Sequence, residues 1–210
     1  MNRLKLKLLF IISLSIFSVS VSAQGVGDLR WETGPKESYI GDKAKITVPD
    51  GYVFLGAEDT AKFMEMNQNL PSGNEYLFAP DDLRWFAVFE FDPVGYVKDN
   101  ETLDSQSLLD TVIEGTKQGN IERRKRGWGT MTILGWKYQP RYDGNTNLLE
   151  WAFLAKSDAD SSQIINYNTR LLGRSGVMTV VLVAEPNVLD ASVAEFKRAI
   201  NGYRYMAGEK

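Results

Sequence analysis

Residues 130–184 read TMTILGWKYQPRYDGNTNLLEWAFLAKSDADSSQIINYNTRLLGRSGVMTVVLVA, and this stretch decides the fold. Its β-branched and aromatic residues fall into four runs of strand length. The runs are 130–138, 148–155, 164–172 and 177–184. The turn pairs Asp143-Gly144 and Ser175-Gly176 stand between successive runs. The segment therefore predicts two antiparallel hairpins.

Shorter β-like runs precede this segment. Residues 44–48 and 52–55 flank the turn Pro49-Asp50-Gly51, whose glycine can supply a positive φ, and we expect a third hairpin there. Residues 85–91 are aromatic and β-branched with little polar alternation. This pattern predicts a strand in the middle of a sheet.

The hydrophobic period changes to that of a helix at residues 104–126. We expect one helical face to carry Leu108, Leu109, Val112, Ile113, Thr116 and Ile121. Asp104 is the expected N-cap and Gly127 the expected stop. A second helix is predicted to begin at Asn187 and to end at Gly202, before a short strand at 203–206.

Antiparallel hairpins combined with helices that stand apart in the chain predict an α+β fold. We expect a mostly antiparallel sheet of about six to eight strands, covered by the long central helix and the C-terminal helix. The order of elements resembles the sandwich of Mog1-type and photosystem-extrinsic proteins. That likeness concerns topology and implies no function.

The first residues have the pattern of a cleavable export signal. Arg3, Lys5 and Lys7 precede an apolar run at 8–21, and Val21-Ser22-Ala23 is a small-residue cleavage site. The sequence therefore predicts a signal peptide at 1–23 and a single domain at 24–210. We expect the protein in the bacterial periplasm or at the outer face of the inner membrane.

Composition excludes several classes of chemistry. Removing residues 1–23 from a chain with 24 basic and 27 acidic side chains leaves a mature protein with a net charge near −6, which argues against nucleic-acid binding. The chain has no Cys and no His. Disulfides, thiolate nucleophiles, imidazole bases and imidazole or thiolate metal sites are therefore excluded. We expect no cofactor and no metal.

Two acidic side chains offer the pattern of a hydrolase. Glu90 and Asp92 fall on one side of the predicted strand, where one carboxyl could protonate a leaving group while the other activates water or attacks. Asp99 is a third candidate. The other interpretation is that these acids are solvated or are paired with Lys and Arg.

A polar stripe marks the strand at 164–172. Asn166, Asn168 and Arg170 project from one face because side chains alternate with period two, and Arg174 lies near the end of the strand. Two amides and a guanidinium suit sugar hydroxyls, peptide backbone or a carboxylate. We expect a solvent-facing platform that is dispensable for folding and needed for binding. A buried network that closes a loop is the competing interpretation.

A basic cluster ends the long helix. Its members are Arg123, Arg124, Lys125, Arg126 and Trp128. Cations beside an aromatic ring suit anionic headgroups, which predicts contact with a membrane surface or with a partner. Positive residues in a last turn also complement the helix dipole, and this structural interpretation requires no ligand.

Several strings occur together in the chain: Pro49 to Leu55, Gly95 to Asp99, Glu122 to Gly127, Gly135-Trp136, Pro140 to Asp143 and Asn166 to Arg174. With them the chain resembles the bacterial domain of unknown function 2167 family, which is described as uncharacterised membrane-anchored proteins. The resemblance covers nearly the whole mature chain and implies no catalytic residues. It implies a hydrophobic C-terminal anchor, which a sequence ending at Gly208-Glu209-Lys210 does not include.

Export without recognisable catalytic residues predicts a binding or scaffold module of the cell envelope. The expected partner is an envelope protein or a glycan, and membrane-surface contact through the basic cluster is a further expectation. The alternative is a carboxylate-dependent hydrolase that acts on envelope glycans through Glu90, Asp92 or Asp99.

Overall fold

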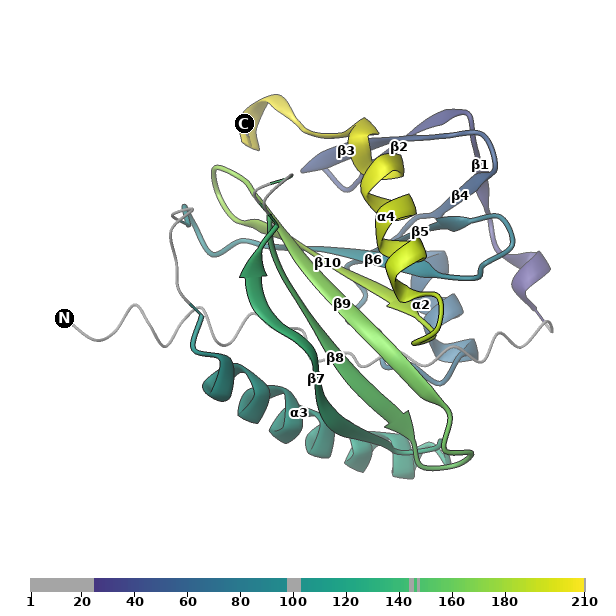
Figure 1. The fold of residues 1–210 in the computed structure, drawn as a ribbon. Helices are drawn as coiled ribbons and strands as arrows, with labels where there is room; N and C mark the ends of the chain where they lie inside the picture. The colour runs from purple at the N-terminus through teal and green to yellow at the C-terminus, as the bar shows by residue number, and fades with distance from the viewer. Residues whose placement is uncertain (1–24, 98–102, 144–145, 147, 210) are drawn as a thin grey trace.

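The computed structural model describes residues 25–97, 103–143, 146 and 148–209. The α-helices are α2 (Ala57–Met66), α3 (Ser105–Lys125) and α4 (Leu189–Ala199). The strands are β1 (Glu32–Thr33), β2 (Lys36–Ile40), β3 (Ala44–Val48), β4 (Tyr52–Leu55), β5 (Glu75–Pro80), β6 (Phe86–Asp92), β7 (Met131–Tyr142), β8 (Leu149–Ser157), β9 (Gln163–Leu172), β10 (Val177–Ala184) and β11 (Tyr203–Tyr205). These elements form the predicted α+β fold (Figure 1).

The large sheet has eight antiparallel strands in the order β1-β4-β5-β6-β10-β9-β8-β7. The hairpins β7–β8 and β9–β10 confirm the two hairpins predicted from residues 130–184. β6 lies between β5 and β10, which confirms the prediction of a central strand. β10 is buried along its whole length. A strand that is covered on both faces has this continuous apolar pattern.

A smaller sheet has the order β11-β3-β2. The predicted hairpin between residues 44–48 and 52–55 is therefore wrong, because β3 pairs with β2 and β11 whereas β4 pairs with β1 and β5. The turn itself exists: Gly51 has φ 76° and the Tyr52 amide donates to the Pro49 carbonyl at 3.2 Å. It carries the chain from one sheet to the other.

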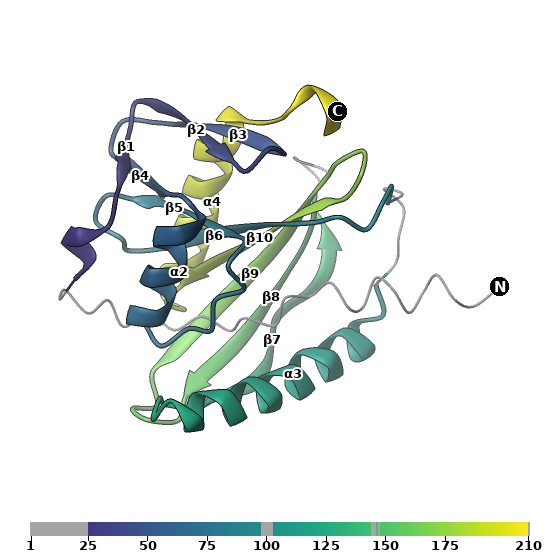
Figure 2. The same ribbon diagram turned by 180° about the vertical axis from the view of Figure 1, so that it is seen from behind.

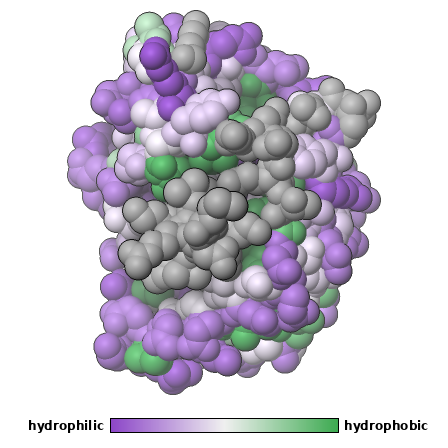
Figure 3. Space-filling view, turned by 90° about the vertical axis from the view of Figure 1, so that its left-hand side faces the viewer, coloured by the Kyte–Doolittle hydropathy of each residue, from purple (hydrophilic) through white to green (hydrophobic). Residues whose placement is uncertain are grey.

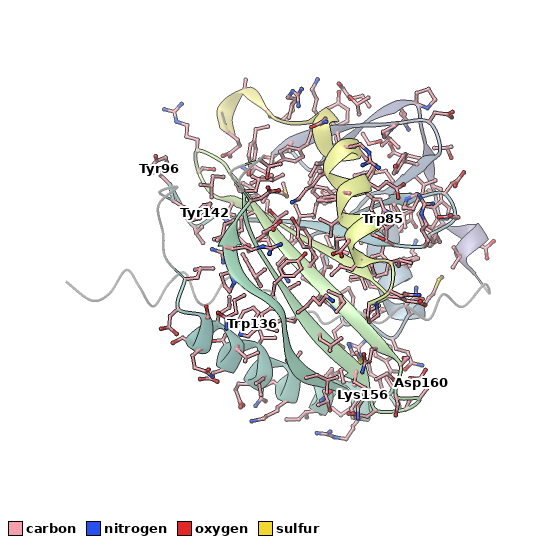
Figure 4. All side chains as sticks on the ribbon, viewed as in Figure 1. Trp85, Tyr96, Trp136, Tyr142, Lys156 and Asp160 are labelled. Atoms are coloured by element: carbon pink, nitrogen blue, oxygen red, sulfur yellow. The ribbon has the colours of Figure 1, made fainter. Side chains whose placement is uncertain are left out.

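The large sheet is covered on both faces (Figures 1 and 2). α2 and α3 pack on one face, where Phe63 and Leu108 join a core with Val181 and other sheet residues. α4 and the small sheet pack on the other face, where Phe196 and Ile46 join a second core. Each large side chain buried in this way contributes about 1.5–3 kcal/mol to folding. Trp136 packs against the first core, and Trp85 belongs to the second (Figure 4).

α3 has the predicted caps. The Asp104 carboxylate accepts a hydrogen bond from the Ser107 amide at 2.6 Å, and Gly127 has φ 71°. Leu108 and Val112 are buried, but Ile121 is 44% exposed, so its assignment to the same face is wrong. At about 100° per residue, Ile121 lies about 220° around the helix from Leu108.

The face on the left of Figure 1 is mostly hydrophilic, with apolar residues in small groups (Figure 3). Within the described ranges, no helix is both long enough and apolar enough to cross a membrane. The predicted signal peptide at 1–23 lies outside those ranges.

Candidate functional site

The polar stripe of β9 lies on one face, as the alternation predicts, but this face is covered. Asn166, Asn168 and Arg170 are 3%, 5% and 7% exposed. They lie on the same face as the apolar residues Val181 and Trp151, which pair with Asn168 from the two neighbouring strands. The prediction of a solvent-facing platform is therefore wrong, because period two shows which residues share a face and not whether another layer covers it.

The contacts of the stripe are those of a buried network. The Asn168 side-chain amide donates to the Asn166 carbonyl at 3.0 Å, and the Arg170 guanidinium lies 5.1 Å from the centre of the Trp151 ring. Arg174 does not belong to this network. It is exposed in the β9–β10 turn, where its backbone amide donates to the Glu209 carbonyl at 2.9 Å.

The acidic candidates lie on the same face of the sheet as the stripe. Asp92 accepts a hydrogen bond from Thr179 at 3.0 Å, and Glu90 accepts one from Ser72 at 2.7 Å. Burial raises the pKa of Asp92 to about 6, with Thr179 and Arg170 opposing the shift and Glu90 adding to it. Asp99 lies outside the described residues.

Sequence reasoning did not single out Glu75, which pairs with Glu90 across β5 and β6. Glu75 is 1% exposed, and burial raises its pKa. One of its carboxylate oxygens accepts hydrogen bonds from the Ser72 and Gly73 amides, at 2.8 and 3.2 Å. Its apolar neighbours in β5 gave no signal that an acid in this strand would be buried.

The basic cluster divides into a buried and an exposed part. Arg123 is 5% exposed and donates to the Gln68 carbonyl at 2.5 Å, so its predicted place on the surface is wrong. The Arg126 guanidinium stacks 4.9 Å from the Trp128 ring centre and donates to Glu122 at 3.2 Å. Lys125 also pairs with Glu122, and Arg124 is exposed. Contact of the exposed part with an anionic surface stays a prediction.

A pocket lies on the opposite face of the sheet, between the β7–β8 hairpin and α4, with a volume of about 440 Å³. Ligand pockets typically measure about 300–1,000 Å³. Seven of its nine lining residues are polar or charged, and two apolar residues of α4 complete it. The lining residues are Tyr138, Arg141, Asp143, Thr146, Glu150, Asp190, Val193, Ala194 and Lys197.

Glu150 is the centre of this pocket's hydrogen bonds. Its carboxylate is 4% exposed and accepts from Arg141 at 3.0 Å, from Tyr167 at 2.8 Å and from Lys197 at 2.8 Å. Three donors compensate the desolvation of a buried carboxylate, which would otherwise cost several kcal/mol. Lys197 also pairs with Asp143. Burial lowers the pKa of Lys197, but these two carboxylates outweigh that effect and raise it.

Arg141 is held in place on two sides. Its guanidinium lies 4.3 Å from the centre of the Tyr138 ring, and its Nε bonds to Glu150. Its side chain is nevertheless 58% exposed.

The sequence analysis did not identify this site, because Glu150 and Lys197 stand 47 positions apart and no local sequence motif contains both. The string Pro140 to Asp143, which carries part of the family resemblance, is the signal in the sequence that falls on this site.

Residues 32–210 match the family described as protein of unknown function DUF2167. The chain belongs to this family. The match includes β1 and every later element, and therefore also the pocket and the β9 stripe. It confirms the family resemblance that the sequence strings indicate.

A search of curated proteins finds no match. Among solved structures, the chain is similar to the solution structure of cyanobacterial PsbP (CyanoP) from Synechocystis sp. PCC 6803, with a TM-score of 0.41 and 9% identity. The similarity covers 84% of this chain and 92% of that chain. A likeness of this degree transfers no function.

Proposed function

We propose that this protein is an exported binding module of the bacterial cell envelope and that its ligand site is the pocket between the β7–β8 hairpin and α4. One observation carries the proposal: a pocket of ligand size is lined by charged side chains that hydrogen bonds already hold in position. Pre-organised polar groups lower the entropy cost of binding. The N-terminal signal pattern supports export, and the outer side of the inner membrane is the proposed location.

An ion-pair network could serve only to join the hairpin to α4. Two features of the pocket indicate that it also binds a ligand. Arg141 remains 58% exposed although it contacts Glu150, and Asp190 lines the pocket without a hydrogen bond or ion pair among the described residues. A purely structural network requires neither an open guanidinium edge nor an unpaired carboxylate.

The test is a binding screen with protein purified from an exporting host. Soluble glycan, peptide and metabolite fractions of the envelope would be added to isotope-labelled protein, and amide chemical shifts would be followed. We expect saturable shifts confined to residues 138–150 and 190–197. A screen in which no fraction gives a saturable shift at these positions would contradict the proposal.

A carboxylate-dependent hydrolase is the second candidate function. Glu90 and Asp92 lie on one face of β6, and an Asp92 pKa of about 6 leaves part of its population protonated near neutral pH, as a general acid requires. Turnover of peptidoglycan or envelope glycans that is lost in both Asp92→Asn and Glu90→Gln would establish this function. Absence of turnover in the native protein would exclude it for those substrates.

A further inference from the structure

The pocket offers a fixed set of hydrogen-bond donors. Arg141 uses its Nε for Glu150 and its ring face for Tyr138, while neither Nη group has a hydrogen bond within the described residues. Because the guanidinium is planar, the stacking and the Nε bond together fix the direction of the remaining N–H groups. The pocket thus presents a rigid edge of donors to a ligand.

The pocket also offers an open acceptor. Asp190 is exposed and lies in the first turn of α4, and its charge contributes to the raised pKa of Tyr138, although burial is the larger cause. Asp190 lines the same pocket as Tyr138 and Arg141. An acid in a first helical turn also gains about 0.3–1 kcal/mol from the helix dipole, but this gain does not require a place in a pocket.

The charges of the lining oppose a charged ligand. Arg141 and Lys197 supply two positive charges, and Asp143, Glu150 and Asp190 supply three negative charges. Both cations already contact carboxylates, so an incoming anion would meet a net negative lining. Two like charges about 4 Å apart repel by about 4 kcal/mol at an effective dielectric constant of 20. A cation could pair with Asp190, but it has no acceptor for the open N–H groups of Arg141.

A ligand rich in hydroxyl groups fits these constraints. A hydroxyl donates to a carboxylate and accepts from a guanidinium without adding charge to the site. Val193 and Ala194 add an apolar part to the lining. One face of a sugar ring consists of C–H groups and can lie against such a surface.

We infer that the pocket binds a neutral sugar, with Arg141 donating to an oxygen of the ligand and Asp190 accepting from a hydroxyl. The inference rests on the proposed function and narrows it to one class of ligand. Arg141 and Asp190 are the residues that determine specificity, while Glu150 and Lys197 position Arg141 and the hairpin.

The experiment compares sugars that share a ring and differ in charge. N-acetylglucosamine is neutral, N-acetylmuramate adds a carboxylate and glucosamine carries an ammonium group. Glucose, galactose and mannose complete the neutral set. Titrations followed by amide chemical shifts should show saturable binding of at least one neutral sugar at the pocket, at low and high salt alike, and weaker binding of its charged counterparts.

Variants test whether the sugar binds in this pocket. Arg141→Gln and Asp190→Asn should each weaken binding of the neutral sugar about tenfold, because the first removes guanidinium donors and the second replaces a charged acceptor with a weaker neutral one. Arg126→Gln is the matched control, since Arg126 also stacks on an aromatic ring and bonds to a carboxylate, but lies outside the pocket. This control should bind the sugar as the native protein does.

The outcomes separate the inference from the proposed function. A charged sugar that binds the pocket better than every neutral one overturns the inference and leaves the binding module standing. Neutral binding that persists unchanged in Arg141→Gln and Asp190→Asn also overturns it. If no sugar binds but an envelope fraction shifts the pocket residues, the sugar assignment fails alone. If neither sugars nor fractions bind, both proposals fail.

Discussion

Asn168 illustrates what a single buried amide does in this fold. It is 5% exposed, and its side chain donates to the Asn166 carbonyl. Replacing it with alanine removes this buried hydrogen bond and the packing of a buried side chain, so Asn168→Ala should lower the free energy of unfolding by about 1–3 kcal/mol. Chemical denaturation measures this loss. The exposed Asn74 is the control, and Asn74→Ala should change stability by less than about 0.5 kcal/mol.

An unchanged unfolding midpoint in Asn168→Ala would contradict the structural role of Asn168 and would favour a role of the stripe in binding.

The sequence could predict that Asn166, Asn168 and Arg170 share a face, because the period of a strand is two. It could not predict the burial of that face. Burial depends on how α2, α3 and the strands pack together, and no local pattern encodes that packing.

Asp92 should make stability depend on pH. Burial raises its folded-state pKa from 3.8 to about 6, so the folded protein holds this proton more tightly than the unfolded chain. Its contribution to stability is therefore present below pH 3.8 and is lost as the pH rises through about 6. Asp92→Asn cannot ionise and should be more stable than the native protein at neutral pH by about 1 kcal/mol, after allowance for solvent screening.

Below the ordinary pKa of aspartate the native protein and Asp92→Asn should have nearly equal stability. Denaturant unfolding at several pH values measures the difference between them. Asp81→Asn, at an exposed acid, is the control for the substitution itself. A stability difference that is the same at acidic and neutral pH would contradict the assignment of this effect to Asp92.

At the scale of elements, α4 is held to the sheet by a carboxylate as well as by its apolar face. Glu195 accepts hydrogen bonds from Tyr52 at 2.7 Å and from Trp85 at 3.1 Å, and pairs with Arg84. Trp85 is fully buried beside α4 (Figure 4), so Glu195→Ala leaves its indole N–H without a partner. The variant should lose about 2–3 kcal/mol of stability in thermal or denaturant unfolding.

Glu114→Ala is the control for this change. Glu114 lies on an exposed part of α3 and contacts Lys117 and Gln118, and surface pairs of this kind contribute little to stability. Equal stability of the Glu195→Ala and Glu114→Ala proteins would show that the apolar face alone holds α4.

The elements that the sequence predicted correctly are the ones with a strong local period. α3, α4 and the four strands of residues 130–184 carry such periods, and all of them are present. α2 and the short strands β1, β2 and β5 were not predicted. The hairpin error at Pro49-Asp50-Gly51 has a related cause. A turn signal predicts a reversal of the chain, whereas pairing with other strands decides which sheet each flanking strand joins: β3 pairs with β2 and β11, and β4 pairs with β1 and β5.

At the scale of the whole molecule, the two faces of the large sheet carry different chemistry. The face under α2 and α3 holds the β9 stripe and the acids Glu75, Glu90 and Asp92, whereas the face under α4 holds the pocket around Glu150. The pocket could not be predicted from the sequence because its walls come from β7, β8 and α4. The acids of β6 could be predicted, because they stand two positions apart in one strand.

The signal peptide pattern at residues 1–23 predicts that the mature chain begins at Gln24. The run 8–21 is shorter than the roughly 20 apolar residues of a membrane span, and Val21-Ser22-Ala23 provides small residues for the signal peptidase. The first described element begins at Val26, so cleavage after Ala23 leaves every described element in place. Intact mass spectrometry of protein from the periplasm of an exporting host should give the mass of residues 24–210. Ala23→Arg should block cleavage and serve as the control, and a native protein that retains residues 1–23 would contradict the prediction.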